Sequence, residues 1–140
     1  MKNNYTKKDI ALSQLRRAIQ LYAQEDYVCA LTLAGAAEEI FGKIVEKYSG
    51  TNALEEDIKA VDKVAAFFGT ESIGRKRLIQ KRNKARNELK HNEPVYNGLI
   101  ESDFKLEAEA LIDRALQNYS FAYGENPQDR VIKRYVNLHY

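Results

Sequence analysis

Residues 26–50, DYVCALTLAGAAEEIFGKIVEKYSG, decide the fold of this chain. Their apolar side chains recur every three or four positions and form one helical stripe, which comprises Ala30, Leu33, Ala34, Ala37, Phe41, Ile44 and Tyr48. Asp26 is a candidate N-cap and Gly50 a stop signal, so the pattern predicts a helix from about 26 to 47. Its small residues around Gly35 allow a neighbouring helix or a second subunit to approach closely.

Similar patterns on both sides of this stretch predict further helices. Start signals occur at Thr6 with Asp9, at Asn52 with Glu55, and then at Ser72, Ser102 and the pair Asn126-Pro127. The expected helices cover residues 7–24, 52–68, 72–91, 102–123 and 127–136, with a loop at 94–98. Short connections favour antiparallel neighbours. The sequence therefore predicts an all-α, up-and-down antiparallel bundle of five helices plus a short C-terminal helix, in one domain spanning 1–140.

Composition narrows the functional classes. The chain is 44% hydrophobic and 30% charged, which is typical of a globular protein. Cys29 is the only cysteine, and the polar start of the chain has no apolar segment of the signal-peptide type, so we expect a cytoplasmic location. The two histidines and Cys29 have no metal-ligand spacing, and no glycine-rich phosphate loop occurs. Neither a metal nor a cofactor is implied, and no membrane partner is expected.

Positive charge is concentrated in the predicted fourth helix. Residues 74–91 contain eight basic residues and one acid, Glu88, a net charge of +7 in a chain whose total is +2, so the remainder carries −5. Such a segregated basic helix favours polyanions as ligands, although a solvated charged face is an equally simple interpretation.

A helical wheel predicts which of these charges face the bundle. Arg82 falls among the core-facing positions and Arg86 on their shoulder, so each needs a carboxylate, a carbonyl or a bound anion as partner. Glu38 lies on the shoulder of the apolar stripe of the 26–47 helix and is the expected partner of Arg86. His91 points about 140° away from Arg86 on an ideal helix, at about 100° per residue. The two side chains converge only if the helix end frays or if a second chain supplies one of them.

The run Arg86-Asn87-Glu88-Leu89-Lys90-His91 resembles the R-x-x-x-x-H signature of the HEPN domains, small helical bundles that include many metal-independent ribonucleases. This resemblance implies RNA cleavage by attack of a 2′-hydroxyl on the adjacent phosphate, at a site shared by two copies in a homodimer. His91 would exchange protons with the attacking or leaving oxygen, and Arg86 would stabilise charge on the phosphorane.

The remaining predicted roles follow from the same resemblance. Asn87 would position the phosphate or orient His91, and Glu38 would hold Arg86, with Arg82 as a second supporting residue. Nucleic-acid contacts are expected from the lysines that flank the motif, namely Lys81, Lys84 and Lys90. A toxin or defence role, with an antitoxin protein as a further partner, is the expected context.

The chain departs from the family pattern at one position. Toxins of this type encoded beside a nucleotidyltransferase antitoxin usually carry a tyrosine two residues after the histidine, where this chain has Glu93. The tyrosine-modification scheme of those pairs therefore does not transfer. Simpler interpretations also stay open, namely a salt bridge for Arg86 and a helix-dipole contact for His91. The alternative function is a noncatalytic bundle that binds a nucleotide, nucleic acid or protein.

Overall fold

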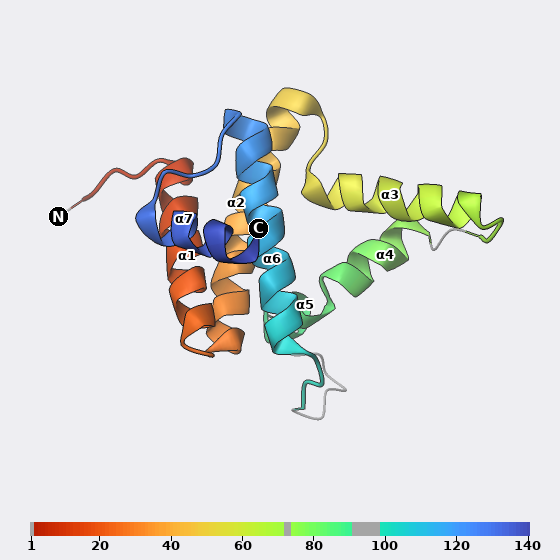
Figure 1. Cartoon of the computed structure of the whole chain (residues 1–140), viewed down its shortest axis with the longest axis horizontal. Coiled ribbons are helices and arrows are strands. Elements are labelled where there is room, and N and C mark those ends of the chain that lie inside the picture. Colours follow the sequence, from red (N-terminus) through yellow and green to blue (C-terminus); the bar gives the residue numbers. More distant parts are fainter. Residues whose placement is uncertain (1, 72–73, 91–98) are drawn as a thin grey trace.

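The computed structural model of the chain describes residues 2–71, 74–90 and 99–140. Within these ranges the chain is helical and has no strand, which confirms the predicted all-α bundle (Figure 1). The helices are α1 (Lys7–Ala23), α2 (Tyr27–Ser49), α3 (Ala53–Phe67), α4 (Arg75–Arg82), α5 (Lys84–Lys90), α6 (Phe104–Tyr123) and α7 (Arg130–His139). No helix in the described ranges is long and apolar enough to cross a membrane.

Side-chain caps fix where most helices begin. Three predicted N-caps are confirmed, because their side-chain oxygens accept a backbone N–H of the first turn: Thr6, Asp26 and Asn52. Gly50 and Gly124 end α2 and α6 in the left-handed conformation, with φ of 70° and 72°. These boundaries are local effects, which explains why the sequence predicts them.

The predicted starts of α4, α6 and α7 are wrong by one to three residues. The N-cap of α4 is Gly74 rather than Ser72 and makes no side-chain hydrogen bond. The cap of α6 is Asp103 rather than Ser102, and its carboxylate accepts the N–H of Leu106 at 3.0 Å. Asp129 rather than Asn126 caps α7, because its Oδ1 accepts the N–H of Val131 and Ile132 at 2.9 and 3.2 Å. In α6 and α7 a carboxylate, which is a strong acceptor at a helix N-terminus, displaces the predicted cap.

The predicted basic helix 72–91 is not continuous. Asn83 interrupts it between α4 and α5; its backbone N–H still bonds to Ile79 O, and its carbonyl accepts the N–H of Asn87. The Asn83 side chain is buried and accepts a hydrogen bond from Arg114 on α6. A tertiary contact therefore sets the break. The wheel assumed one straight helix, and its placement of Arg82 toward the core is wrong, because Arg82 is exposed.

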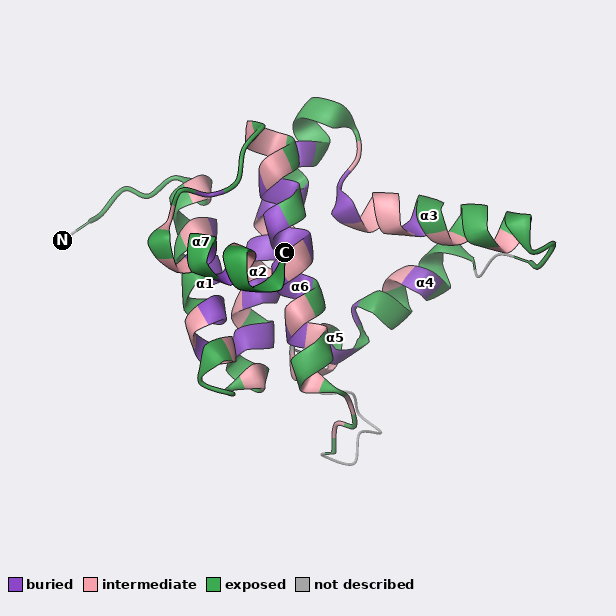
Figure 2. Ribbon diagram, viewed as in Figure 1, coloured by how far each residue is buried: buried purple, intermediate pink, exposed green. Residues whose placement is uncertain are grey.

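Helices α1, α2 and α6 form the centre of the bundle, and α7 crosses α1 (Figure 1). Burial is concentrated in these helices (Figure 2). Small residues on α2, including Ala34, Gly35 and Ala37, are buried and let α1 and α6 approach closely. The largest fully buried apolar side chains come from all four helices and include Leu15, Phe41, Leu111, Ile112 and Ile132.

Helices α3 and α4 extend from the bundle as an arm, which is mostly exposed (Figures 1 and 2). Only Ala53 and Ile58 are buried on α3, and only Leu78 on α4. At the far end of the arm Phe67 and Phe68 are 84% and 72% exposed. The buried residues of α3 thus lie in the first half of the helix.

Asn118 connects the base of the arm to the bundle. It is fully buried on α6, and its Oδ1 accepts the N–H of Ala53 at 2.7 Å, in the first turn of α3. Its Nδ2 donates to the carbonyl of Glu38 on α2 at 3.4 Å. One amide side chain thus satisfies two buried backbone groups and holds three helices together.

Substitution of Asn118 by Ala is expected to lower the free energy of unfolding by about 1–3 kcal/mol, because it leaves the Ala53 N–H buried without a partner. Asn137→Ala, at an exposed position of α7, is the matched control and should change stability by less than about 0.5 kcal/mol. Urea denaturation followed by circular dichroism measures both. Equal effects of the two substitutions would contradict this role of Asn118.

Candidate functional site

Arg86 lies inside the bundle edge rather than on the free surface of the basic segment. Its Nη1 is 3.1 Å from Oε2 of Glu38, and the two side chains are 14% and 7% exposed. The structure thus contains the Arg86–Glu38 contact that the helical wheel predicts. Because a buried carboxylate needs a charged partner, this ion pair fixes the position of α5 against α2.

A second arginine, Arg114 on α6, shares the Glu38 carboxylate. Its Nε lies 3.8 Å from Oε1 of Glu38, and its Nη2 donates to Oδ1 of Asn83 at 3.0 Å. Sequence reasoning missed this residue, because Arg114 lies outside the apolar stripe of α6. At about 100° per residue it falls about 60° beyond Leu111, and only the packing of the helices buries it.

We call Arg86, Glu38 and Arg114 the Arg-Glu-Arg cluster. Two guanidinium groups surround one carboxylate, so the cluster has one positive charge in excess. Burial lowers the pKa of Arg114, while Glu38 raises it and Arg86 lowers it again. The Nε–H groups of both arginines are buried and have no hydrogen-bond partner in the described part of the chain. The positive charge in excess of the carboxylate favours an anion near the cluster.

Gly35 provides the space for Arg86 to cross α2. A Cβ at this position would lie 2.6 Å from Cδ and 3.1 Å from Cγ of Arg86. Real Cβ atoms do not approach other atoms so closely. Position 35 therefore needs glycine because a larger residue would clash with Arg86, and not because of the backbone angles of Gly35. The small-residue stretch in the quoted segment thus serves a side chain of α5 as well as helix packing.

The other predicted site residues are distributed differently. Asn87 is exposed on α5, as are the side chains of Lys81 and Arg82 on the arm. Lys84 is exposed and lies 4.0 Å from Glu88, one turn further along α5. Lys90 ends α5, but its side chain is outside the described part of the structure. His91 also lies outside the described residues, so its predicted role remains a prediction.

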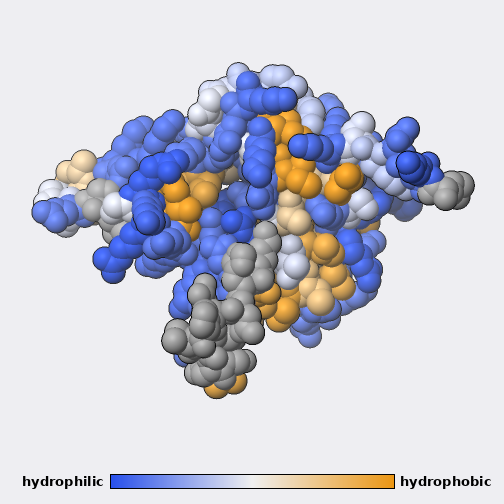
Figure 3. Space-filling model, turned by 180° about the vertical axis from the view of Figure 1, so that it is seen from behind, coloured by the Kyte–Doolittle hydropathy of each residue, from blue (hydrophilic) through white to orange (hydrophobic). Residues whose placement is uncertain are grey.

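A cleft opens where the arm meets α6, and we call it the arm cleft. Its volume is about 580 Å³, within the range of small-ligand pockets, and apolar side chains gather at this junction (Figure 3). Its basic lining residues are Lys81, Arg82 and Arg114. Arg114 therefore belongs both to the Arg-Glu-Arg cluster and to the wall of the cleft. The arm cleft is therefore the surface opening that contacts a residue of the Arg-Glu-Arg cluster directly.

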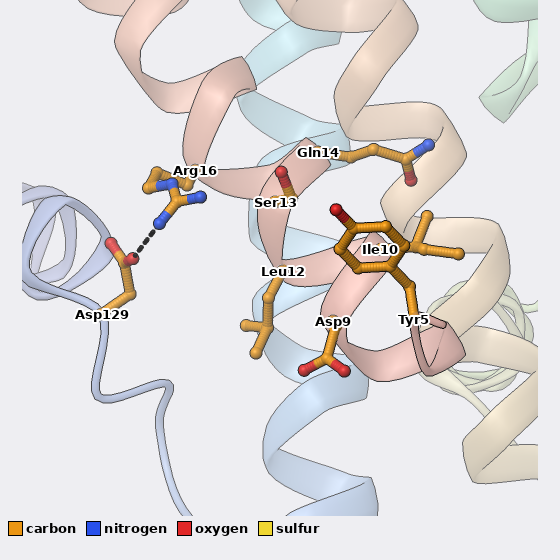
Figure 4. Close-up of a pocket in the computed structure, with 8 residues that line it drawn as sticks. All are labelled: Tyr5, Asp9, Ile10, Leu12, Ser13, Gln14, Arg16 and Asp129. Atoms are coloured by element: carbon orange, nitrogen blue, oxygen red, sulfur yellow. Dashed lines mark hydrogen bonds and ion pairs between the residues drawn. The ribbon is translucent and has the colours of Figure 1, made fainter. Parts of the chain in front are cut away.

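Two further hollows have less to offer an anion. One, over the first half of α1, has a volume of about 590 Å³ (Figure 4). Its charged groups are already engaged, because Asp9 caps α1 and Arg16 pairs with Asp129 at 3.3 Å. The other lies between α1 and α7 and has mostly apolar walls, including Ile19 and Leu138. Neither contains a buried guanidinium, which leaves the Arg-Glu-Arg cluster as the candidate site.

Comparison of the chain with protein-family models, with curated proteins and with solved structures gave no match. The class that the structure itself defines is an all-α bundle with a buried cluster of two arginines and one glutamate, contributed by α2, α5 and α6.

Gly35→Ala should lower the free energy of unfolding by about 1–3 kcal/mol, because the added methyl group displaces Arg86. An alanine normally stabilises a helix interior relative to glycine, so the expected sign is opposite to helix propensity. Gly42→Ala, in the interior of the same helix, is the control, since a Cβ there meets its nearest neighbour, Nδ2 of Asn118, at an ordinary contact distance of 3.4 Å. Thermal denaturation of both variants measures the difference. Stabilisation by Gly35→Ala would show that Arg86 lies elsewhere in solution.

Glu38→Gln should destabilise the protein by about 3–5 kcal/mol, because it leaves two buried guanidinium groups without a counter-charge. Glu39→Gln removes the same charge from the neighbouring position, where Glu39 pairs with Lys43 on the surface, and should cost no more than about 1 kcal/mol. Sulfate should restore more stability to Glu38→Gln than to Glu39→Gln, as measured by melting temperature. Equal losses for both variants would contradict the cluster.

Proposed function

We propose that this protein is a HEPN-like metal-independent endoribonuclease of the toxin or defence type, with a cleavage site shared between two copies of the chain. The observation that carries the proposal is the Arg-Glu-Arg cluster. It holds Arg86 through Glu38 and carries more positive than negative charge, which favours an anion nearby. Arg86 is also the first residue of the Arg86-Asn87-Glu88-Leu89-Lys90-His91 motif.

The proposed reaction uses the RNA's own nucleophile. The 2′-oxygen attacks the adjacent phosphorus and loses its proton, the bond from phosphorus to the 5′-oxygen breaks, and the leaving 5′-oxygen takes up a proton. The products are a 2′,3′-cyclic phosphate and a 5′-hydroxyl. His91 exchanges the protons, as suits an imidazole near neutral pH. Arg86 donates hydrogen bonds to the phosphorane oxygens, where negative charge develops.

The supporting roles follow the surface charges. Glu38 orients Arg86, and Asn87, exposed one residue further along α5, positions the phosphate or His91. Lys81 and Lys84 lie exposed on the two sides of the Asn83 break and contact the RNA backbone, together with Lys90 and Arg82. Such contacts make affinity strongly salt-dependent. Arg86 and His91 point in different directions on one ideal helix, so in this proposal a homodimer brings Arg86 of one chain close to His91 of the other. An antitoxin protein is the further partner.

A second candidate function is a noncatalytic bundle that binds a nucleotide, nucleic acid or protein. The observation that favours it is the burial of Arg86, which is only 14% exposed and already pairs with Glu38. An arginine so placed also serves as a purely structural ion-pair partner. The two functions differ in one measurable property, namely whether RNA is cleaved.

RNA digestion in the presence of EDTA tests the proposal. Wild-type protein should cleave RNA and leave 2′,3′-cyclic phosphate ends, and Arg86→Ala and His91→Ala should each reduce the rate by about a hundredfold or more. Arg134→Ala and His139→Ala alter exposed residues of α7 and are the matched controls. Absence of cleavage by the wild type while RNA still binds would favour the second function. Cleavage that persists in both motif variants would contradict the proposed roles of Arg86 and His91.

Mixing the two inactive variants tests the shared site. If Arg86 of one chain acts with His91 of the other, a mixed dimer of Arg86→Ala and His91→Ala contains one intact site. Reassembly of equal amounts should then restore about a quarter of wild-type activity, because about half of the dimers are mixed and one of two sites is intact. No recovery, with mixed dimers demonstrated by mass, would place both groups in one chain.

A further inference from the structure

The arm cleft has the composition of a nucleobase site rather than of a simple phosphate site. Apolar side chains from the arm and from α6 face each other across it, including Val61, Leu78, Leu106 and Leu111. Three acids, Asp57 from α3 together with Glu107 and Asp113 from α6, line the same space as Lys81 and Arg82. A pure phosphate site has no use for apolar walls or carboxylates. A base has a flat apolar face and an edge of hydrogen-bonding groups, and so matches both.

Glu107 provides the directional contact. Its carboxylate is partly buried, and burial raises its pKa, while Arg114 and Arg82 lower it. A carboxylate accepts hydrogen bonds, so it recognises a base edge that carries N–H donors. Guanine presents two adjacent donors, the ring N1–H and the exocyclic amine, and matches the two oxygens of one carboxylate. Uracil presents a single N–H, and inorganic phosphate offers chiefly acceptors.

Arg114 links this cleft to the proposed cleavage centre. It lines the cleft and also lies against Glu38, whose other oxygen contacts Arg86. A base in the cleft is therefore connected through Arg114 and Glu38 to Arg86, which binds the scissile phosphate in the proposed reaction. Lys81 and Arg82 line the arm side of the cleft. Their positive charges can bind the phosphate of the nucleotide whose base occupies the cleft.

We propose that the arm cleft is a specificity site that binds a guanine base of the RNA, with Glu107 accepting its edge donors and the apolar walls covering its face. This inference rests on the proposed function for its link to cleavage. Base binding itself is measured separately, because a mononucleotide has no phosphodiester bond to cleave.

Titration with the four nucleoside 5′-monophosphates, followed by calorimetry and backbone NMR shifts, tests the site. Guanosine monophosphate should bind about tenfold more tightly than uridine monophosphate, and shifts should concentrate at residues of the cleft. Glu107→Gln should weaken guanosine monophosphate binding about tenfold and leave uridine monophosphate binding nearly unchanged. Glu125→Gln, an exposed acid beyond the other end of α6, is the matched control and should change neither.

A steric variant provides a second, independent readout. Ala110 is exposed and lines the cleft on α6, so Ala110→Leu fills part of the space from a position outside the core. It should weaken binding of all four nucleotides in a protein that folds normally. Equal affinity for inorganic phosphate and for all four nucleotides, or binding unaffected by Ala110→Leu, would overturn the proposal. Nucleotide binding with these properties in a protein that cleaves no RNA would instead refute only the proposed reaction.

Discussion

The attachment of the basic segment to the bundle depends on one buried carboxylate. Glu38 lies inside the bundle on α2, and a charge there is tolerated only because two guanidinium groups surround it. Arg86 comes from α5 and Arg114 from α6, so the requirement for counter-charge joins three helices. Gly35 must lack a side chain to let Arg86 through. The apolar core gives the bundle its stability, but this cluster fixes how the basic segment is attached to it.

The break at Asn83 follows from the same cluster. Arg114 donates to the Asn83 side chain, and the chain turns there between α4 and α5. As a result α5 stays against α2, while α4 departs with α3 as the arm and takes Lys81 and Arg82 to the wall of the arm cleft. The basic run thus divides into a part that completes a buried cluster and a part that faces solvent. These are different electrostatic environments and support different proposed roles.

Much of the local structure was predictable because its causes are local. Caps such as Thr6 and Asn52 act on the next turn, and the apolar stripes of α1, α2 and α6 match the helical period. The Arg86–Glu38 contact was predictable for a related reason, since a charge beside an apolar stripe needs a partner on a neighbouring helix. Arg114 and Asn83 were missed, because Arg114 lies outside the apolar stripe of α6 and Asn83 is polar, so periodicity does not place either of them in the interior.

The sequence by itself determined the helical class, most helix boundaries and the segregation of charge. Those properties depend on residues within a few turns of one another. Only the tertiary structure decided that two arginines share Glu38, that the basic segment divides at Asn83, and that the arm and α6 enclose a cleft. These three features depend on how helices that are distant in sequence cross one another. Hydrophobic periodicity predicts which face of a helix is buried, but not which helix packs against that face.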